Sequence, residues 1–198
     1  KKSQNKINIS NDNTPFITII LSARNEADSI GKCLECLVNQ TYPSNRYEII
    51  PVNDASEDQT MEIINNYMSE NEKIKPININ PGERHKQGKI NAIDKGILNA
   101  KGEIIITTDA DTWMGTEWIS KMVGSFDVST GFVLGITLDQ MSNNPVHAFH
   151  ALDSIGMCVI GAALAEMNNP ITCRGTNIAF RKEAYLQVRK KVILLSAT

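Results

Sequence analysis

The stretch Ile104-Ile105-Ile106-Thr107-Thr108-Asp109-Ala110-Asp111 decides the fold of this 198-residue chain. Its first five residues are all β-branched, and such a run is typical of a strand buried on both faces. The two carboxylates follow at the carboxyl end of that strand, where open α/β sheets bind their ligands. Because side chains two apart on an extended chain point the same way, Asp109 and Asp111 can face one ligand. Such carboxylates suit Mg²⁺ or Mn²⁺, although a solvated acidic turn is the alternative for so short a pattern.

The segments before this strand alternate between strand and helix patterns. Continuous apolar runs predict strands, and apolar residues at helical spacing predict helices between them. The expected strands cover residues 17–22, 47–53, 74–80 and 103–108, and the expected helices cover 27–39, 58–68 and 88–100. Pro51 favours a position near the end of the second strand, since proline cannot donate to a ladder. Strands joined by helices in this way predict an α/β fold with a mostly parallel central sheet and helices on both faces.

The strict alternation ends after Asp111. We expect a helix at 116–126, a strand at 131–139, an apolar helix at 144–167, an extended segment at 171–181 and another helix from 182 onward. The apolar helix is expected in the core, because a helix that is apolar all round is normally buried. These patterns predict one domain over residues 15–188, preceded by a disordered polar linker at 1–14 and followed by an atypical tail at 189–198.

The composition is that of an ordinary globular domain, with 41% hydrophobic and 21% charged residues. A net charge of −2 provides no broad basic field, so we expect no nucleic-acid partner. No second C-x-x-C pair completes a zinc site, which favours free thiols and a cytoplasmic protein; the cysteines are Cys33, Cys36, Cys158 and Cys173. The most apolar window, 151–165, is shorter than the ~20 residues that cross a bilayer. The basic residues 1–6 would suit a juxtamembrane linker, which would place the protein on the cytoplasmic face of a membrane.

Polar clusters also follow the first two strands. Residues 22–26 read Ser-Ala-Arg-Asn-Glu, and residues 52–58 read Val-Asn-Asp-Ala-Ser-Glu-Asp. At this edge of the sheet, Asp54 would present a carboxylate to a base or a ribose. A structural role is the alternative. Asn25 or Asp28 could cap the following helix, and Ser56 or Asp58 could cap the next one.

A cationic loop precedes the third expected helix. Residues 84–89 read Arg-His-Lys-Gln-Gly-Lys, and Lys89 stands at a helix start where a pyrophosphate could bind, unless this is an ordinary charged surface loop. The sequence has no G-x-G-x-x-G after its first strand and no Walker-type motif, which disfavours the usual dinucleotide and P-loop sites. The D-x-D-x-T pattern at 109–112 also resembles the haloacid-dehalogenase phosphatase signature. Here it follows the fourth strand and no Asp-Asp pair comes later, so a phosphatase ranks only third among the functions considered.

Four of these segments occur in order at strand ends, and together they resemble the family 2 glycosyltransferases of the GT-A fold. They are Ala23-Arg24-Asn25-Glu26, Val52-Asn53-Asp54-Ala55-Ser56, Lys89-Ile90-Asn91-Ala92 and Asp109-Ala110-Asp111. A fifth segment, 173–181, is similar to the family's acceptor-side G-x-N-x-x-x-R motif, which would place Gly175 and Asn177 beside a carbohydrate or lipid-linked acceptor. The resemblance covers residues 14–188. It implies inverting sugar transfer to an acceptor hydroxyl, with a UDP-sugar as the expected donor, as in the synthesis of cell-envelope polysaccharides.

The resemblance implies a site for a nucleotide-diphosphate sugar made of Ala23, Arg24, Asn25, Glu26, Asp54, Ser56, Lys89, Asp109, Ala110 and Asp111. Asp54 would accept a hydrogen bond from the base, and Lys89 would lie near the uridine or the pyrophosphate. Asp109 would bind the ribose or the sugar. Asp111 would ligate the Mg²⁺ or Mn²⁺ that bridges the two phosphates and acts as a Lewis acid.

The same resemblance predicts a catalytic base that these residues do not supply. The family carries an acidic general base beyond the position of Val188, but no acidic residue follows Glu183 in this sequence. We therefore assign no catalytic residue, and a nucleotide-binding fragment without turnover is the alternative function. Asp139 and Asp153 could replace the base, but we expect burial with a hydrogen-bond partner for each of them instead.

Overall fold

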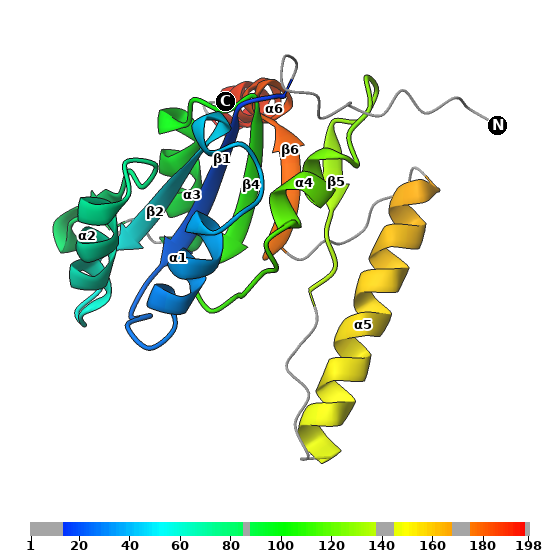
Figure 1. Cartoon of the computed structure of the whole chain (residues 1–198). Helices are drawn as coiled ribbons and strands as arrows, with labels where there is room; N and C mark the ends of the chain where they lie inside the picture. Colours follow the sequence, from blue (N-terminus) through cyan, green and yellow to red (C-terminus); the bar gives the residue numbers. More distant parts are fainter. Residues whose placement is uncertain (1–13, 85–87, 138–144, 168–174, 197–198) are drawn as a thin grey trace.

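The protein folds around a six-stranded mixed sheet. The computed structural model describes residues 14–84, 88–137, 145–167 and 175–196 (Figure 1). The strands are β1 (Ile17–Ala23), β2 (Tyr47–Asp54), β3 (Ile77–Ile79), β4 (Ile104–Asp109), β5 (Phe132–Leu134) and β6 (Asn177–Arg181), in the spatial order β3-β2-β1-β4-β6-β5. The first four pair in parallel, and β6 runs antiparallel to β4 and β5. The predicted mostly parallel α/β sheet is confirmed.

Helices cover both faces of the sheet. One face packs against α1 (Ile30–Val38), α2 (Thr60–Glu70) and α4 (Trp118–Val123), and the other packs against α3 (Gly88–Asn99) and α6 (Lys182–Ser196). A hydrophobic core lies on each face of the sheet, and alternate residues of each central strand pack into one core or the other. Ile19 faces α1, whereas the next residue, Ile20, faces α3, and neither is exposed to solvent. Burial on both sides explains why the central strands read as unbroken apolar runs.

Pro51 lies inside β2, four residues after its start, rather than near its end. β2 is also a central strand, so a missing N–H could have left a carbonyl unpaired. The pairing of β2 with the β3 side is interrupted at this point. An isolated bridge joins Ile49 to Ile74, and the ladder with β3 begins only at Val52 and Ile77. Pro51 falls in the gap, which explains both its position and the shortness of β3.

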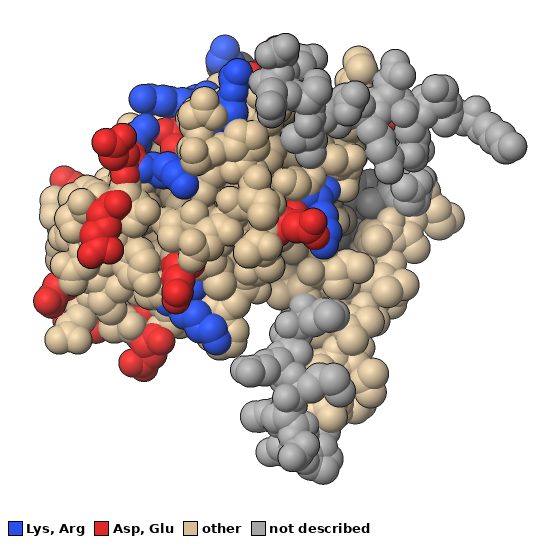
Figure 2. All heavy atoms as spheres, viewed as in Figure 1, with Lys and Arg blue, Asp and Glu red and all other residues tan. Residues whose placement is uncertain are grey.

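The apolar helix α5 (Pro145–Glu166) corrects the expectation of a core helix. Figure 1 shows it beyond the β5 edge of the sheet, and Figure 2 shows a largely uncharged surface there. Phe149 and Leu152 expose 70% and 69% of their surface. The described elements cover little of this helix because β5 is short and lies at the edge of the sheet. Among the described residues, none of the helices is both long and apolar enough to cross a membrane.

A buried carboxylate ties the amino ends of the central strands together. Glu48 of β2 accepts hydrogen bonds from the Thr18 hydroxyl at 2.8 Å and the Lys101 backbone N–H at 2.7 Å, and it pairs with the Lys75 ammonium at 3.0 Å. The Thr18 hydroxyl in turn accepts the Gly102 N–H. Burial alone would raise the pKa of Glu48, but these donors and the Lys75 charge outweigh it and lower the pKa below the ordinary 4.5.

Replacing Glu48 with glutamine should flatten the acid limb of the stability curve. A lowered folded-state pKa means that the ionised carboxylate stabilises the fold above pH 4.5 and loses this effect as the pH falls through the folded-state pKa. We therefore expect wild-type stability to fall more steeply below pH 4.5 than that of Glu48→Gln. Urea unfolding from about pH 3 to pH 6 measures the difference. The exposed Glu35→Gln variant should follow the wild type, and identical slopes for Glu48→Gln and the wild type would contradict the assignment.

Candidate nucleotide site

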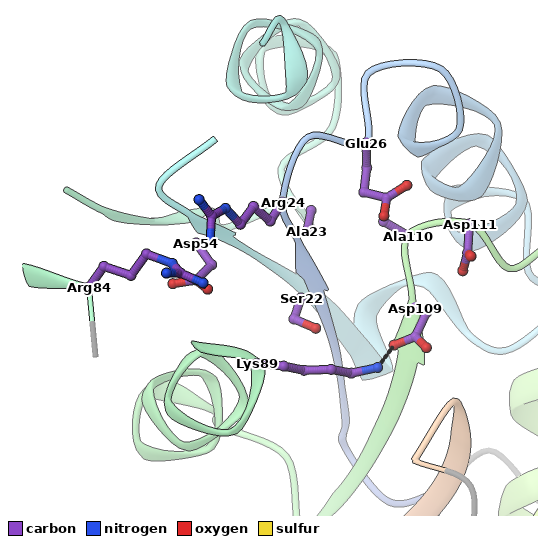
Figure 3. Close-up of a pocket in the computed structure, with 10 residues that line it drawn as sticks. All are labelled: Ser22, Ala23, Arg24, Glu26, Asp54, Arg84, Lys89, Asp109, Ala110 and Asp111. Atoms are coloured by element: carbon purple, nitrogen blue, oxygen red, sulfur yellow. Dashed lines mark ion pairs between the residues drawn. The ribbon is translucent and has the colours of Figure 1, made fainter. Parts of the chain in front are cut away.

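A cleft opens at the carboxyl ends of β1, β2 and β4 (Figure 3). Its volume of about 290 Å³ lies at the lower end for small-molecule sites. It is lined by Ser22, Ala23, Arg24, Glu26, Asp54, Arg84, Lys89, Asp109, Ala110 and Asp111. The structure thus brings together all of the predicted nucleotide-sugar residues except Asn25 and Ser56. The parallel strands that carry them end at one level of the sheet, as the position of the motifs predicts.

Asp54, the last residue of β2, presents one engaged and one open carboxylate oxygen. Its side chain is only 5% exposed, and Oδ2 lies 3.4 Å from Nε of Arg84. Oδ1 is buried and has no hydrogen-bond partner among the described residues. Gly88 approaches closely, with φ at +30°, and a Cβ there would lie 3.2 Å from both Asp54 Oδ2 and the Arg84 guanidinium. A buried acceptor without a donor is costly, so Oδ1 is suited to a ligand N–H.

The β4 turn carries one paired and one free carboxylate. Lys89 Nζ, from the start of α3, lies 2.5 Å from Asp109 Oδ1. The backbone carbonyl of Asp109 accepts the Thr112 N–H and, at 3.6 Å, the Cys33 thiol. Asp111 is exposed, and in the described part of the chain its carboxylate enters no hydrogen bond or ion pair. Lys89 therefore neutralises Asp109 and leaves Asp111 available.

The described residues of the cleft offer a divalent metal few protein ligands. No group of three or more His, Cys, Asp or Glu residues in the described ranges is placed to bind a metal by itself. Mg²⁺ and similar ions commonly take one or two carboxylates and complete their shell with substrate phosphates and water. The free Asp111 carboxylate fits this arrangement, and the two oxygens of a diphosphate would supply further ligands.

Asn25 and Ser56 join the two loops that flank the cleft instead of lining it. The Asn25 N–H donates to Ser56 Oγ at 3.1 Å, and Asn25 Oδ1 accepts the Glu57 N–H at 2.9 Å. Asn25 adopts a φ of +55°, a left-handed conformation that asparagine tolerates better than most residues. Capping of α1 by Asn25 is therefore not observed, and the N-cap is Ser29, without a capping side-chain bond. The two residues position the loop that follows Ala23, the last residue of β1.

A second contact between these loops centres on the fully buried Thr60. Its hydroxyl accepts the Glu26 N–H at 2.8 Å and donates to Asp58 Oδ1 at 2.5 Å. Asp58 also accepts the N–H groups of Thr60 and Ala27, but the N-cap of α2 is Gln59, without a side-chain capping bond, so the predicted capping by Asp58 is not observed. Partial burial would raise the pKa of Asp58, but the bonds from Thr60 and Ala27 outweigh it and lower the pKa. The loop that carries Glu26 is thus fixed to the start of α2.

The predicted acceptor-side residues lie outside the cleft lining. The Gly175 carbonyl accepts the Thr107 hydroxyl at 3.0 Å, and Asn177 begins β6 opposite Thr108. Of the two candidate substitute bases, Asp139 falls outside the described residues. Asp153 is exposed on α5, so its expected burial is wrong.

Sequence reasoning missed two cleft residues, Ser22 and Arg84. Ser22 stands in the polar cluster after β1, and Arg84 opens the cationic loop that Lys89 closes. The sequence marks both stretches as candidates, but it does not show which side chain of each stretch points into the cleft. Among the thiols, Cys33 is buried and its burial raises the pKa to about 12, in keeping with an unreactive, free cysteine. Cys173 lies outside the described residues.

The sheet order and the loops at its carboxyl edge define a GT-A type α/β domain. A mannosyltransferase from Pyrobaculum calidifontis, PcManGT, solved with GDP-Man and Mn²⁺, has this fold. It superposes with a TM-score of 0.63 and 22% identity, covering 88% of this chain and 46% of that one. S. aureus TarS, residues 1–349 in complex with UDP, superposes with a TM-score of 0.52 and 20% identity over 65% of this chain and 37% of that chain.

The family match makes the relationship specific. The model described as Glycosyl transferase family 2 matches residues 18–188, so this chain belongs to that family. It is 38% identical over 127 residues to a poly(ribitol-phosphate) beta-glucosyltransferase of Bacillus spizizenii, covering 61% of this chain and 19% of that protein. It is 31% identical over 111 residues to the glycosyltransferase AglE of Haloferax volcanii, covering 56% of this chain and 35% of that protein. The chain spans about a third or less of these relatives. The family match leaves the phosphatase hypothesis without support.

Substituting Thr60 with valine should loosen the β1–α1 loop. Valine keeps the shape but leaves the Glu26 N–H without its acceptor, at a cost of about 1–3 kcal/mol. We expect urea unfolding to show that loss for Thr60→Val. Thr60→Ser, which keeps the hydroxyl and loses one methyl group, should be less destabilising at about 1 kcal/mol. Equal stability of the two variants would show that the hydroxyl bond contributes nothing.

Proposed function

We propose that the cleft binds a UDP-sugar and that the protein transfers its sugar, with inversion, to an acceptor hydroxyl. The observation that carries the proposal is the buried, unpartnered Oδ1 of Asp54 at the inner end of the cleft. The imide N–H of a uracil is a donor of the kind this oxygen lacks. Arg84 orients the carboxylate by holding Oδ2, while Oδ1 has no hydrogen-bond partner among the described residues and can accept one from the ligand.

We propose that the diphosphate lies toward Lys89 and Asp111. Lys89 reaches over the cleft from the start of α3, and its ammonium can exchange Asp109 for a phosphate oxygen. Asp111 would hold a Mg²⁺ or Mn²⁺ ion together with the two phosphates. When bound, such an ion supplies Lewis-acid stabilisation of the departing diphosphate. Asp109, released from Lys89, is then free to accept hydrogen bonds from the ribose or the sugar.

We propose a carbohydrate or lipid-linked acceptor approached from the β6 side. Support comes from two matched proteins. One is the poly(ribitol-phosphate) beta-glucosyltransferase described above. The other is a beta-monoglucosyldiacylglycerol synthase of Trichormus variabilis, which is 30% identical over 112 residues and covers 57% of this chain and 24% of that protein. Their names indicate a polymer and a lipid acceptor. A position at the cytoplasmic face of a membrane, in cell-envelope synthesis, stays a prediction.

A second candidate, nucleotide binding without turnover, has support from the cleft itself. Asp54 is held by Arg84, Asp109 by Lys89, and the Glu26 carboxylate accepts the Ser29 hydroxyl. Among the cleft-lining residues, Asp111 alone is an unengaged carboxylate, and its proposed role is metal binding. A general base for the acceptor would therefore come from outside this lining. Turnover of UDP-sugars separates the two candidates.

UDP with Mn²⁺ should stabilise the protein against heat. A ligand at about 100-fold above its Kd adds about 2.7 kcal/mol, which for a domain of this size raises Tm by about 5–10 °C. Asp54→Asn removes the charge from the acceptor of the base and should weaken UDP binding roughly tenfold or more. Thermal shift and calorimetric titration measure both effects, with Asp28→Asn, at an exposed residue of the β1–α1 loop, as control. No stabilisation of the wild type by any nucleoside diphosphate would contradict the proposal.

Asp111→Ala should abolish the dependence of UDP binding on Mn²⁺. The variant removes the free carboxylate, whereas Asp28→Ala removes an exposed carboxylate outside the cleft lining. We expect the Kd of UDP to improve on addition of Mn²⁺ for the wild type and Asp28→Ala, and to stay unchanged for Asp111→Ala. A full Mn²⁺ effect in Asp111→Ala would exclude its role as the metal ligand.

A further inference from the structure

The side chain of Asn177 is engaged at both ends of its amide. Its Oδ1 accepts the indole N–H of Trp118 at 3.0 Å, and its Nδ2 donates to the Ile136 carbonyl at 3.2 Å. The Gly135 N–H donates to the backbone carbonyl of Asn177 at 2.8 Å. These three bonds join the start of β6 to α4 and to the segment that continues β5. The amide that the motif would offer to an acceptor is thus committed to the protein's own groups.

Gly135 packs directly against this amide. A Cβ at position 135 would lie 2.4 Å from the amide carbon, oxygen and nitrogen of Asn177, far inside contact distance. Any side chain at that position would displace the Asn177 amide from Trp118. At Gly131, before the other end of β5, a Cβ would meet no atom within 4 Å. The two glycines therefore form a natural pair of test and control positions.

The backbone around Trp118 is held in place by the segment that follows α1. The buried Gln40 side chain donates from Nε2 to the Gly115 carbonyl at 2.9 Å and accepts the Ile119 N–H at Oε1 at 3.1 Å. The Thr41 N–H donates to the Thr116 carbonyl at 2.8 Å. The backbone on both sides of Trp118 is thus fixed, and so is the turn that follows Asp111. A rigid donor of this kind can hold a neighbouring segment in one position.

We propose that Asn177 is a positioning residue and not an acceptor ligand: the Trp118–Asn177 hydrogen bond holds residues 175–177 beside the cleft. The inference rests on the proposed function for its statement that this segment faces the acceptor. The acceptor would then meet the backbone of the segment and Thr176, while the Asn177 amide sets where they lie. The hydrogen bond joins this segment to the first residue of α4, the helix that follows the turn after Asp111.

The experiment uses the two tryptophans of the chain, Trp113 and Trp118, as reporters. Their indole N–H groups give two cross-peaks in a ¹H–¹⁵N spectrum, and Trp113→Phe assigns them. We expect Asn177→Ala and Gly135→Ala to shift the Trp118 peak and speed its exchange with solvent. Hydrogen exchange of the backbone amides of residues 175–178 should rise at least roughly tenfold in Trp118→Phe, Asn177→Ala and Gly135→Ala. Trp113→Phe and Gly131→Ala should match the wild type.

A UDP titration with Mn²⁺ separates local positioning from general destabilisation. The Kd of UDP should stay within about twofold of wild type in Trp118→Phe, because none of the residues that line the cleft lies on α4, β5 or β6. An unmoved Trp118 peak in Asn177→Ala, unchanged exchange at 175–178 in Trp118→Phe, or faster exchange spread over the whole domain would each overturn the inference. Failure of the wild type to bind UDP would refute the proposed function and leave the spectral and exchange results to decide this inference on their own.

Discussion

The parallel register of the three central strands is the constraint on which the cleft depends. β1 pairs with β2 so that Ala23 lies opposite Asn53, and with β4 so that Ser22 lies opposite Asp109. The loops after all three strands therefore begin at one level. A slip of one residue would turn each buried side chain to the other face, which the two packed cores do not allow. The tight burial of the β-branched runs thus places the polar strand ends side by side.

Charge pairing then decides which of the clustered acids remain open to a ligand. Four carboxylates line a small cleft, and left unpaired they would repel one another. Arg84 pairs with Asp54 and Lys89 pairs with Asp109; Arg84 lies between β3 and α3, and Lys89 lies at the start of α3. The buried Oδ1 of Asp54 and the exposed Asp111 are the acceptors left over, at opposite ends of the cleft. This spacing suits a ligand with a donor at one end and bound metal at the other, as a nucleoside diphosphate has.

The sheet, its helical layers and the family could be predicted from the sequence because their causes are local. Continuous β-branched runs at 17–20 and 104–108 are best satisfied by burial on both faces, and the polar residues that follow each strand then lie at the sheet edge. The inner position of Pro51 could not be predicted in this way, since it depends on where the neighbouring β3 ladder begins. The exposure of α5 likewise depends on which elements reach it.

The candidate site was predictable in its strand-end residues and less so in its loops. Asp54, Asp109 and Asp111 take their positions from strands, so the pattern alone places them. The positions of loop side chains depend instead on partners that are distant in the sequence. Asn25 and Ser56 bind one another's loop, and their polar character alone does not distinguish this role from ligand binding.

The two sides of the site rest on different kinds of support. The residues that we propose bind the nucleotide lie at or just after strand ends whose register the cores fix, and the flanking loops are joined through the buried Thr60. The segment at 175–177 has no such frame. This segment is held by the hydrogen bonds that Thr107 donates to the Gly175 carbonyl and Trp118 donates to the Asn177 side chain. Removing one side-chain bond disturbs such a segment more than it disturbs a strand end, because fewer contacts compensate for the loss. Substitutions around α4 and β5 can therefore reshape the segment at 175–177, the proposed acceptor side, while the cleft at the strand ends keeps its geometry.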